Sequence, residues 1–280
     1  CLVLVVEDQA DMAGHIMQGL DQQRLDKALT VGITGPPGAG KSTLTSALVH
    51  HLREQDVRVG IIAVDPSSPL TQGALMGDRI RMMDHALDRD VVVRSMATRG
   101  RLGGVCASAG AAMRIMAASS CRVVLVETVG IGQSEMDIAS LADITLLVLA
   151  PGFGDEIQAM KAGILEVVDL LVINKADMPG ARKLLFDLGR EAAGSDRVLE
   201  TVASERQGTV DLLKGILALE TRLRHGEELR QRRQRSLKKE TVDWSLELLR
   251  KRLNTLIDEQ SFSGMEPRAA AEQLLKSIFA

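Results

Sequence analysis

One short segment constrains the fold more than any other: GPPGAGKST at residues 35–43, which follows the apolar run TVGIT and opens a helix-like stretch. It satisfies G-x-x-x-x-G-K-[ST], the pattern of a loop that wraps phosphates between a strand and a helix. We expect the Lys41 ammonium to reach the β- and γ-phosphates and the Ser42 hydroxyl to bind Mg²⁺. The predicted phosphate-loop residues are Gly35, Pro36, Pro37, Gly38, Ala39, Gly40, Lys41, Ser42 and Thr43.

Short β-branched runs alternate with helix-length amphipathic segments over most of the chain. Strands that are apolar on both faces and are joined by helical crossovers indicate a mostly parallel, doubly wound sheet. The sequence therefore predicts the α/β fold of a P-loop NTPase, in which ligands bind at the carboxyl ends of the strands. The predicted strands are 30–35, 57–65, 91–97, 122–129, 143–150, 170–177 and 197–203.

Composition excludes several function classes. The net charge is −3, so no positive field would attract nucleic acid or an anionic membrane. Aromatic residues make up 2% of the 280 residues, which argues against a surface that stacks on the bases of single-stranded nucleic acid. No apolar run reaches the roughly 18 residues that a membrane span needs. The three cysteines, Cys1, Cys106 and Cys121, lack metal or redox spacing, which predicts a reducing, cytoplasmic environment.

The motif NKAD at 174–177 ends the predicted strand LLVIN and predicts guanine specificity. The Asp177 carboxylate can accept hydrogen bonds from the ring N–H and the 2-amino group of guanine, and adenine lacks this pair of donors. Asn174 can meet the O6/N7 edge, and the Lys175 stem can lie along the ring. A site built for those donors rejects adenine because its acceptors would stay unpaired. After the next strand, backbone N–H groups are expected near O6, from Val202, Ala203 and Ser204.

Oxygen-bearing side chains at the loop and strand ends predict a Mg²⁺ shell: Ser42, Asp65, Asp78 and Glu127. Taken singly, Asp65 is also typical of a turn and Asp78 of a helix cap. Mg²⁺ on nucleotide phosphates binds few protein oxygens directly, so we expect some of these groups to act through water.

The segment VETVGIGQSEMD at 126–137 continues from the metal-side acid Glu127. The Gly130 N–H can contact the γ-phosphate, and loss of that phosphate would release the segment, as in GTPase switches. Lys41, Glu127 and Gly130 are the predicted catalytic residues. Gln133 lies one residue further from Gly130 than the Gln of small Ras-like GTPases, so it is given no catalytic role.

The chain divides into three predicted parts. Residues 1–29 form an N-terminal helical segment, which begins at Cys1 without Met and is expected to be trimmed or fragmentary. Residues 30–219 form the P-loop GTPase domain. Residues 220–280 form a helical arm that packs on the domain or on a second subunit. Within the arm, the basic run 228–239 is typical of a solvated helix face.

A further segment, RSMATRGRLGG at 94–104, carries Arg94, Arg99 and Arg101 around a glycine-rich turn. Two interpretations stay open: a solvated loop, or a mobile loop that senses a partner or donates an arginine.

Seven segments in this order resemble the MeaB/ArgK family, the methylmalonyl-CoA mutase-associated GTPases: GITGPPGAGKSTL, VDPSSP, GDRIRM, RSMATRGRLGG, VETVGIGQSE, PGFGDEIQAMKAGI and NKAD. The resemblance covers residues 30–219 well and the C-terminal helices more loosely. It implies a GTPase of low intrinsic turnover that chaperones an adenosylcobalamin-dependent acyl-CoA mutase, methylmalonyl-CoA mutase above all. Such a protein gates cofactor loading and protects the mutase from inactivation.

The resemblance also implies GTP or GDP and Mg²⁺ as ligands, and a homodimer formed by the C-terminal extension. Gly152–Gly163 resembles the family's additional mobile switch, which faces the mutase. There the family often has two adjacent lysines, whereas this chain has Lys161 followed by Ala162, so no coupling role is carried over to the second position.

Two other function classes stay open. A small-molecule kinase or transport ATPase needs phosphate-clamping arginines, for which Arg99 and Arg101 are candidates, although NKAD argues against ATP. A nickel-insertion GTPase commonly presents His or Cys ligands. The five histidines of this chain show no tight cluster, and Cys106 and Cys121 are expected to be small core residues.

Overall fold

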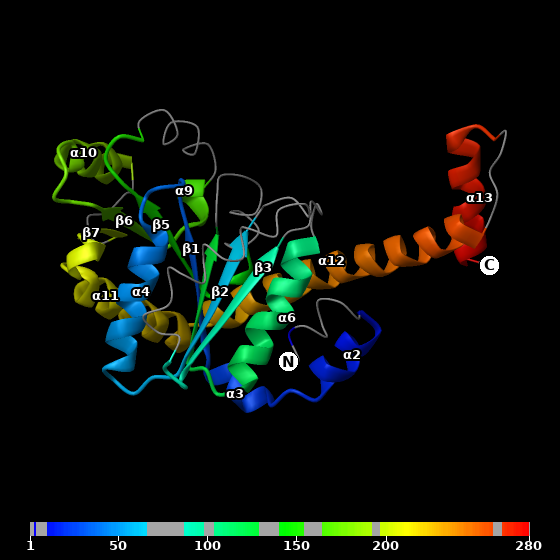
Figure 1. The fold of residues 1–280 in the computed structure, drawn as a ribbon, viewed down its shortest axis with the longest axis horizontal. Coiled ribbons are helices and arrows are strands. Elements are labelled where there is room, and N and C mark those ends of the chain that lie inside the picture. The colour runs from blue at the N-terminus through cyan, green and yellow to red at the C-terminus, as the bar shows by residue number, and fades with distance from the viewer. Residues whose placement is uncertain are drawn as a thin grey trace.

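The computed structural model describes residues 3, 10–65, 87–97, 104–128, 140–153, 164–191, 197–259 and 265–279. Seven strands form one parallel sheet in the order β3-β2-β4-β1-β5-β6-β7 (Figure 1). All seven lie within or beside the ranges predicted from the sequence, and the doubly wound α/β fold is confirmed. The strands are β1 Leu29–Thr34, β2 Val59–Asp65, β3 Val91–Ala97, β4 Val123–Thr128, β5 Ile144–Leu149, β6 Leu170–Asn174 and β7 Val198–Thr201.

Helices follow most of the strands, as the alternating pattern predicts. Among the described residues, no helix is long and apolar enough to cross a membrane. The helices α2 and α3 lie within residues 1–29. The helices are α2 Ala10–Gln18, α3 Gln22–Lys27, α4 Lys41–Arg53, α6 Gly104–Ala118, α9 Ile164–Val167, α10 Ala181–Glu191, η3 Ala203–Glu205, α11 Thr209–His225, α12 Glu228–Glu259 and α13 Pro267–Phe279.

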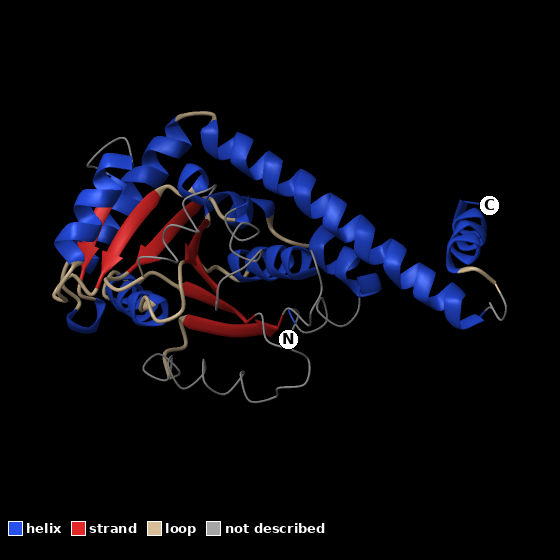
Figure 2. Ribbon diagram, turned by 90° about the horizontal axis from the view of Figure 1, so that it is seen from above, coloured by secondary structure: helices blue, strands red, loops and turns tan. Residues whose placement is uncertain are grey.

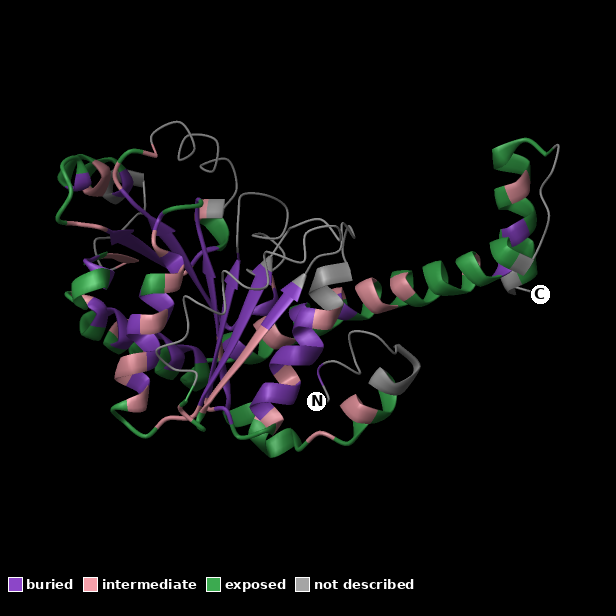
Figure 3. Ribbon diagram, in the orientation of Figure 1, coloured by how far each residue is buried: buried purple, intermediate pink, exposed green. Residues whose placement is uncertain are grey.

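Both faces of the sheet are buried (Figure 3). In β2, Val59 and Ile61 belong to one core cluster, whereas Ile62 and Val64 belong to the other. The first cluster includes leucines of α4 and α11, and the second includes methionines of α6. This arrangement follows from the strand sequences, because successive side chains of a strand point to opposite faces and here both sets are apolar.

The helix α12 leaves the body of the protein and carries α13 at its far end (Figures 1 and 2). Its first half is fixed to the domain. Arg233 contacts the buried Asp143 carboxylate at 2.8 Å, Arg232 contacts Asp169 at 2.8 Å, and Lys239 donates to Ser140 Oγ at 2.7 Å. The prediction that 228–239 is a solvated face is therefore wrong for these three residues. Arg232 and Arg233 pair with acids that directly precede β6 and β5, and Lys239 donates to a hydroxyl, contacts that the local sequence of α12 does not reveal.

Candidate functional site

The loop between β1 and α4 lies at the carboxyl end of the central strand. Two of its glycines, Gly35 and Gly40, occur where a side chain would not fit. A Cβ on Gly35 would collide with the Val148 carbonyl of β5, and a Cβ on Gly40 would collide with the Asn174 amide of β6. Gly35 and Gly40 also have positive φ angles of 139° and 91°, which favour glycine. The sheet and the glycine pattern together hold the loop close to its neighbours.

Lys41 is the first residue of α4 and is only 6% exposed. Its Nζ donates to the carbonyl oxygens of Gly35 at 2.6 Å and Pro36 at 3.0 Å. The ammonium is thus held against the loop backbone at a helix N-terminus, where the helix dipole also favours an anion. This placement suits a lysine that contacts nucleotide phosphates.

Ser42 and Glu127, which the sequence assigns to one metal shell, are brought together. Ser42 Oγ donates to Glu127 Oε1 at 2.5 Å, and Thr45 Oγ1 lies 3.3 Å from Glu127 Oε2. Glu127 lies near the end of β4, next to Ile33 of β1, and is 3% exposed. A buried carboxylate beside a hydroxyl offers the hard oxygen ligands that Mg²⁺ prefers. The chemistry of this donor pair fits a magnesium ion beside the phosphate loop.

Asn174 connects the phosphate loop to the turn after β7. Its Nδ2 donates to Ala39 O at 2.9 Å, and its Oδ1 accepts from Thr201 Oγ1 and from Ala203 N, both at 3.1 Å. The sequence predicts contact with the base edge for this residue, whereas the structure gives its amide a bracing role between two loops. The Ala203 N–H, which the sequence places near guanine O6, donates to Asn174 Oδ1 in this structure.

The remaining residues predicted at the base site lie around this brace. Lys175 is half-buried with φ 56°, and Asp177 is exposed. Val202 is buried, whereas Ser204 is exposed in the short helix η3. Backbone N–H groups in the first turn of a helix lack an intrahelical partner, so the Ser204 N–H has the character of a ligand donor.

Several predicted residues cannot be compared with the structure. Asp65 ends β2 as expected, paired with Ala97, but its side chain lies outside the described part. Arg94 lies in β3. The other residues lie outside the described ranges: Asp78, Arg99, Arg101, Gly130, Gln133, Lys161 and Ala162.

Two residues near the site were missed by sequence reasoning. Thr45 accompanies Glu127 and also donates to Lys41 O at 2.9 Å. Its position one helical turn after Lys41 was the available signal. The Phe153 ring would lie 3.5 Å from a Cβ on Gly38, so an aromatic side chain adjoins the phosphate loop. The PGF sequence directly after β5 was the signal for this contact.

The histidines differ from expectation. His50, His51 and Glu54 lie at the end of α4, and their ligand atoms are all within 4.8 Å of one another. The prediction of no tight cluster is therefore wrong for His50 and His51, because a helical turn brings Glu54 back to both rings. Cys121 is buried, as expected for a small core residue.

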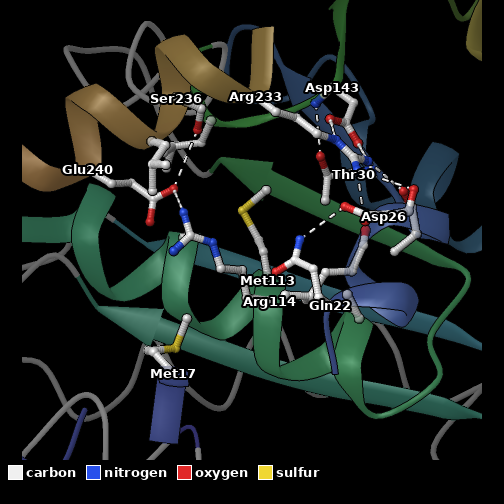
Figure 4. A pocket seen from close by; sticks show the side chains of 16 residues that line it. Met17, Gln22, Asp26, Thr30, Met113, Arg114, Asp143, Arg233, Ser236 and Glu240 are labelled. Carbon is white, nitrogen blue, oxygen red and sulfur yellow. Dashed lines mark hydrogen bonds and ion pairs between the residues drawn. The ribbon is translucent and has the colours of Figure 1, made fainter. Parts of the chain in front are cut away.

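A separate cavity of about 310 Å³ lies between α3, α6 and α12 (Figure 4). Thr30 and Asp143, at or just before the amino ends of β1 and β5, line it, so it is distinct from the phosphate loop. Glu240 of α12 is 4% exposed and pairs with Arg114 of α6 at 2.6 Å. Its Oε2 has no hydrogen-bond partner among the described residues. Burial raises the pKa of Glu240 above its ordinary value.

Several known proteins are similar to this chain in sequence or in fold. A Pyrococcus abyssi protein, named a GTPase by inference, is 39% identical over a 296-residue alignment that covers 99% of this chain and 91% of that protein. GTPase ArgK of Escherichia coli is 36% identical over 247 residues, which cover 81% of this chain and 73% of that protein. The crystal structure of a protein named LAO/AO transport system kinase gives a TM-score of 0.65 at 26% identity, covering 99% of this chain and 91% of that one. Residues 2–258 match the family described as "Methylmalonyl Co-A mutase-associated GTPase MeaB". The chain therefore belongs to the MeaB family of methylmalonyl-CoA mutase-associated GTPases.

Proposed function

We propose that this protein binds and slowly hydrolyses GTP with Mg²⁺, and that the nucleotide state controls an adenosylcobalamin-dependent acyl-CoA mutase. The observation that carries the proposal is the pairing of Ser42 with the buried Glu127 beside Lys41. A metal-binding hydroxyl, a buried acid and a loop lysine are the parts that phosphoryl transfer to water needs.

In the proposed mechanism, Lys41 and the amides of residues 35–43 bind the phosphates. Ser42 and Glu127 would hold Mg²⁺, with Asp65 and Asp78 acting directly or through water. The ion, when bound, would neutralise charge on the phosphates. Gly130 would contact the γ-phosphate through its N–H, so that its segment responds to hydrolysis.

For the base, we propose that Asp177 accepts from the guanine N–H groups and that Lys175 lies along the ring. The Ser204 N–H would donate to O6. Asn174 would act indirectly, by holding the phosphate loop against the turn that carries Ser204. These hydrogen bonds would fix the phosphate-binding part of the site relative to the base-binding part.

The proposed client is methylmalonyl-CoA mutase or a related acyl-CoA mutase, which the family description supports. The protein would gate cofactor loading and protect the mutase from inactivation. GTP and ATP hydrolysis are to be measured with and without this mutase. We expect a preference for GTP and faster turnover with the partner, and the absence of both would overturn the proposal.

We also propose that residues 220–280 form a homodimerisation arm. Val242, Leu246 and Leu249 of α12 are exposed by 57%, 60% and 41%, and their spacing places them on one face. Leu246→Glu should shift the mass measured by light scattering from dimer to monomer. Lys251→Glu, on the opposite side of the helix, is the matched control and should stay dimeric.

A small-molecule kinase is the second candidate, favoured by the similarity to the protein named LAO/AO transport system kinase. The two functions differ in where the γ-phosphate goes. Release of all γ-phosphate as inorganic phosphate supports the GTPase, whereas transfer to a small acceptor supports the kinase. A third candidate, a nickel-insertion GTPase, is tested by isolating the proteins that bind this chain in its GTP-analogue and GDP states. Recovery of a nickel enzyme, and not of a cobalamin enzyme, would support that function.

A further inference from the structure

The last turn of α4 carries three convergent ligand groups. His50 Nε2 lies 3.3 Å from Glu54 Oε1, and His51 Nδ1 lies 3.1 Å from Glu54 Oε2. Glu54 is three and four residues after the two histidines, a spacing that places side chains on one helix face. Nine residues separate His50 from Lys41, which is about 14 Å along a helix axis, so this cluster is remote from the phosphate loop.

The ring of His51 is oriented by hydrogen bonds behind it. Its Nε2 lies 2.9 Å from Thr209 Oγ1, and the Thr209 hydroxyl donates to Arg206 O at 2.7 Å. Because that hydroxyl has one hydrogen, Thr209 Oγ1 must accept from His51, and Nε2 carries the proton. Metal-binding histidines are usually held in this way, with the second ring N–H donated to a fixed acceptor. Thr209 is fully buried, which makes the support rigid.

In the neutral ring, Nδ1 of His51 then carries a lone pair that faces a carboxylate oxygen of Glu54. Two lone pairs 3.1 Å apart need a positive centre between them, which is either a second proton on the ring or a metal ion. The geometry suits both.

We propose that His50 Nε2, His51 Nδ1 and the Glu54 carboxylate form a binding site for a borderline divalent ion of the Zn²⁺, Co²⁺ and Ni²⁺ class. Two imidazoles and one carboxylate are a ligand set of zinc sites that leave one position to water or another ligand. Imidazole nitrogen selects this class over Mg²⁺, which prefers oxygen. The site is therefore chemically separate from the magnesium site at Ser42 and Glu127.

Arg206 competes with the metal. Its Nη1 lies 3.2 Å from His50 Nε2, so the guanidinium occupies the lone pair that the ion would use. Metal binding requires Arg206 to move away, and the charge of Arg206 opposes a nearby cation. Arg206 is exposed and ends the short helix η3, so its side chain has room to take another direction in solvent. Removing it should strengthen metal binding.

The test is titration of the full chain with Zn²⁺ at neutral pH by calorimetry, in the presence of Mg²⁺. We expect one ion per chain. Glu54→Gln and His50→Ala should each weaken binding by about tenfold or more, and Arg206→Gln should strengthen it severalfold. Glu54 is exposed, so Glu54→Gln keeps the fold, which near-identical unfolding curves would verify.

His225→Ala, which removes an exposed histidine at the end of α11, is the matched control and should bind as the unaltered chain does. Co²⁺ absorption without a thiolate charge-transfer band would show that the cysteines do not hold the ion. Failure to bind Zn²⁺, or binding unaffected by both Glu54→Gln and His50→Ala, would overturn the proposal. None of these results depends on GTP hydrolysis.

Discussion

Ser42 Oγ and Glu127 Oε1 are joined by a 2.5 Å hydrogen bond, although 85 residues separate them in the chain. Ser42 is the second residue of α4, the helix that follows the phosphate loop, and Glu127 lies near the end of β4. Parallel pairing of β1 with β4 brings these two ends together. The contact is thus a consequence of sheet order, and it defines the expected position of the metal.

Glu127→Gln should lower Mg²⁺-dependent GTP hydrolysis by about a hundredfold, because it removes the charge that would hold the ion while it keeps the shape of the side chain. The free energy of unfolding should change much less. The measurement is turnover as a function of Mg²⁺ concentration. Thr45→Val removes the other hydroxyl on Glu127 without removing a predicted metal ligand and should have a smaller effect on turnover. Unchanged turnover in Glu127→Gln would contradict the assignment.

Asp177→Asn should abolish the preference for GTP over ATP, because the amide cannot accept from both guanine donors. We expect GDP affinity, measured by calorimetry, to fall by about a hundredfold or more, while ATP affinity changes little. Asp187→Asn, at an exposed site of α10, alters charge equally and should leave both affinities intact. A GTP preference that survives in Asp177→Asn would favour the kinase.

The strands and the phosphate loop could be predicted from sequence because their signals are local. Apolar runs such as IIAV and ITLLVL have no polar face, so only a sheet that is covered on both sides can bury them. The loop pattern likewise fixes Gly35, Lys41 and Ser42 without any knowledge of distant residues. Glu127 was placed at the same site because the carboxyl ends of parallel strands share one edge.

The remaining features depend on contacts between distant segments. The brace from Asn174 to Ala39 spans 135 residues, and the bond from Arg233 to Asp143 spans 90. Neither has a periodicity or spacing that a sequence displays. For the same reason the basic run of α12 is predicted to be solvated, since Asp143 and Asp169, which pair with it, lie far away in the sequence, directly before β5 and β6.

Asn174→Ala should lower GTP and ATP binding alike, in contrast to Asp177→Asn. Its loss leaves the Ala39 carbonyl and the Ala203 N–H buried without partners, at a cost of about 1–3 kcal/mol in the free energy of unfolding. Urea unfolding and affinities for both nucleotides measure the two effects. Thr201→Val removes only one bond of the brace and should cost less. If Asn174→Ala has normal stability and affinity, the brace has no energetic role.

Arg233→Met should destabilise the protein by about 3 kcal/mol. Arg233 binds Asp143 through two nitrogens, at 2.8 Å each, and the Asp143 side chain is only 4% exposed. Removing one partner of a buried ion pair leaves the other charge uncompensated. Arg230→Met, which removes an arginine that is 82% exposed, is the control and should change stability by less than about 0.5 kcal/mol. Equal effects of the two substitutions in urea unfolding would show that the ion pair between Arg233 and Asp143 contributes nothing to stability.

The stability of the protein should carry a pH dependence that originates at Glu240. Burial raises its pKa in the folded state above the ordinary value of 4.5, so in the interval between the two values the folded chain binds a proton that the unfolded chain releases. Stability from this group is therefore gained as the pH falls through that interval and lost as it rises.

Glu240→Gln removes the titration and keeps an acceptor for Arg114. The difference in unfolding free energy, variant minus unaltered protein, should decrease as the pH is lowered from neutral toward the ordinary value of 4.5, by at most about 1.4 kcal/mol per pH unit. Taking the difference cancels the other carboxyl groups, and a constant or increasing difference on acidification would contradict the role of Glu240.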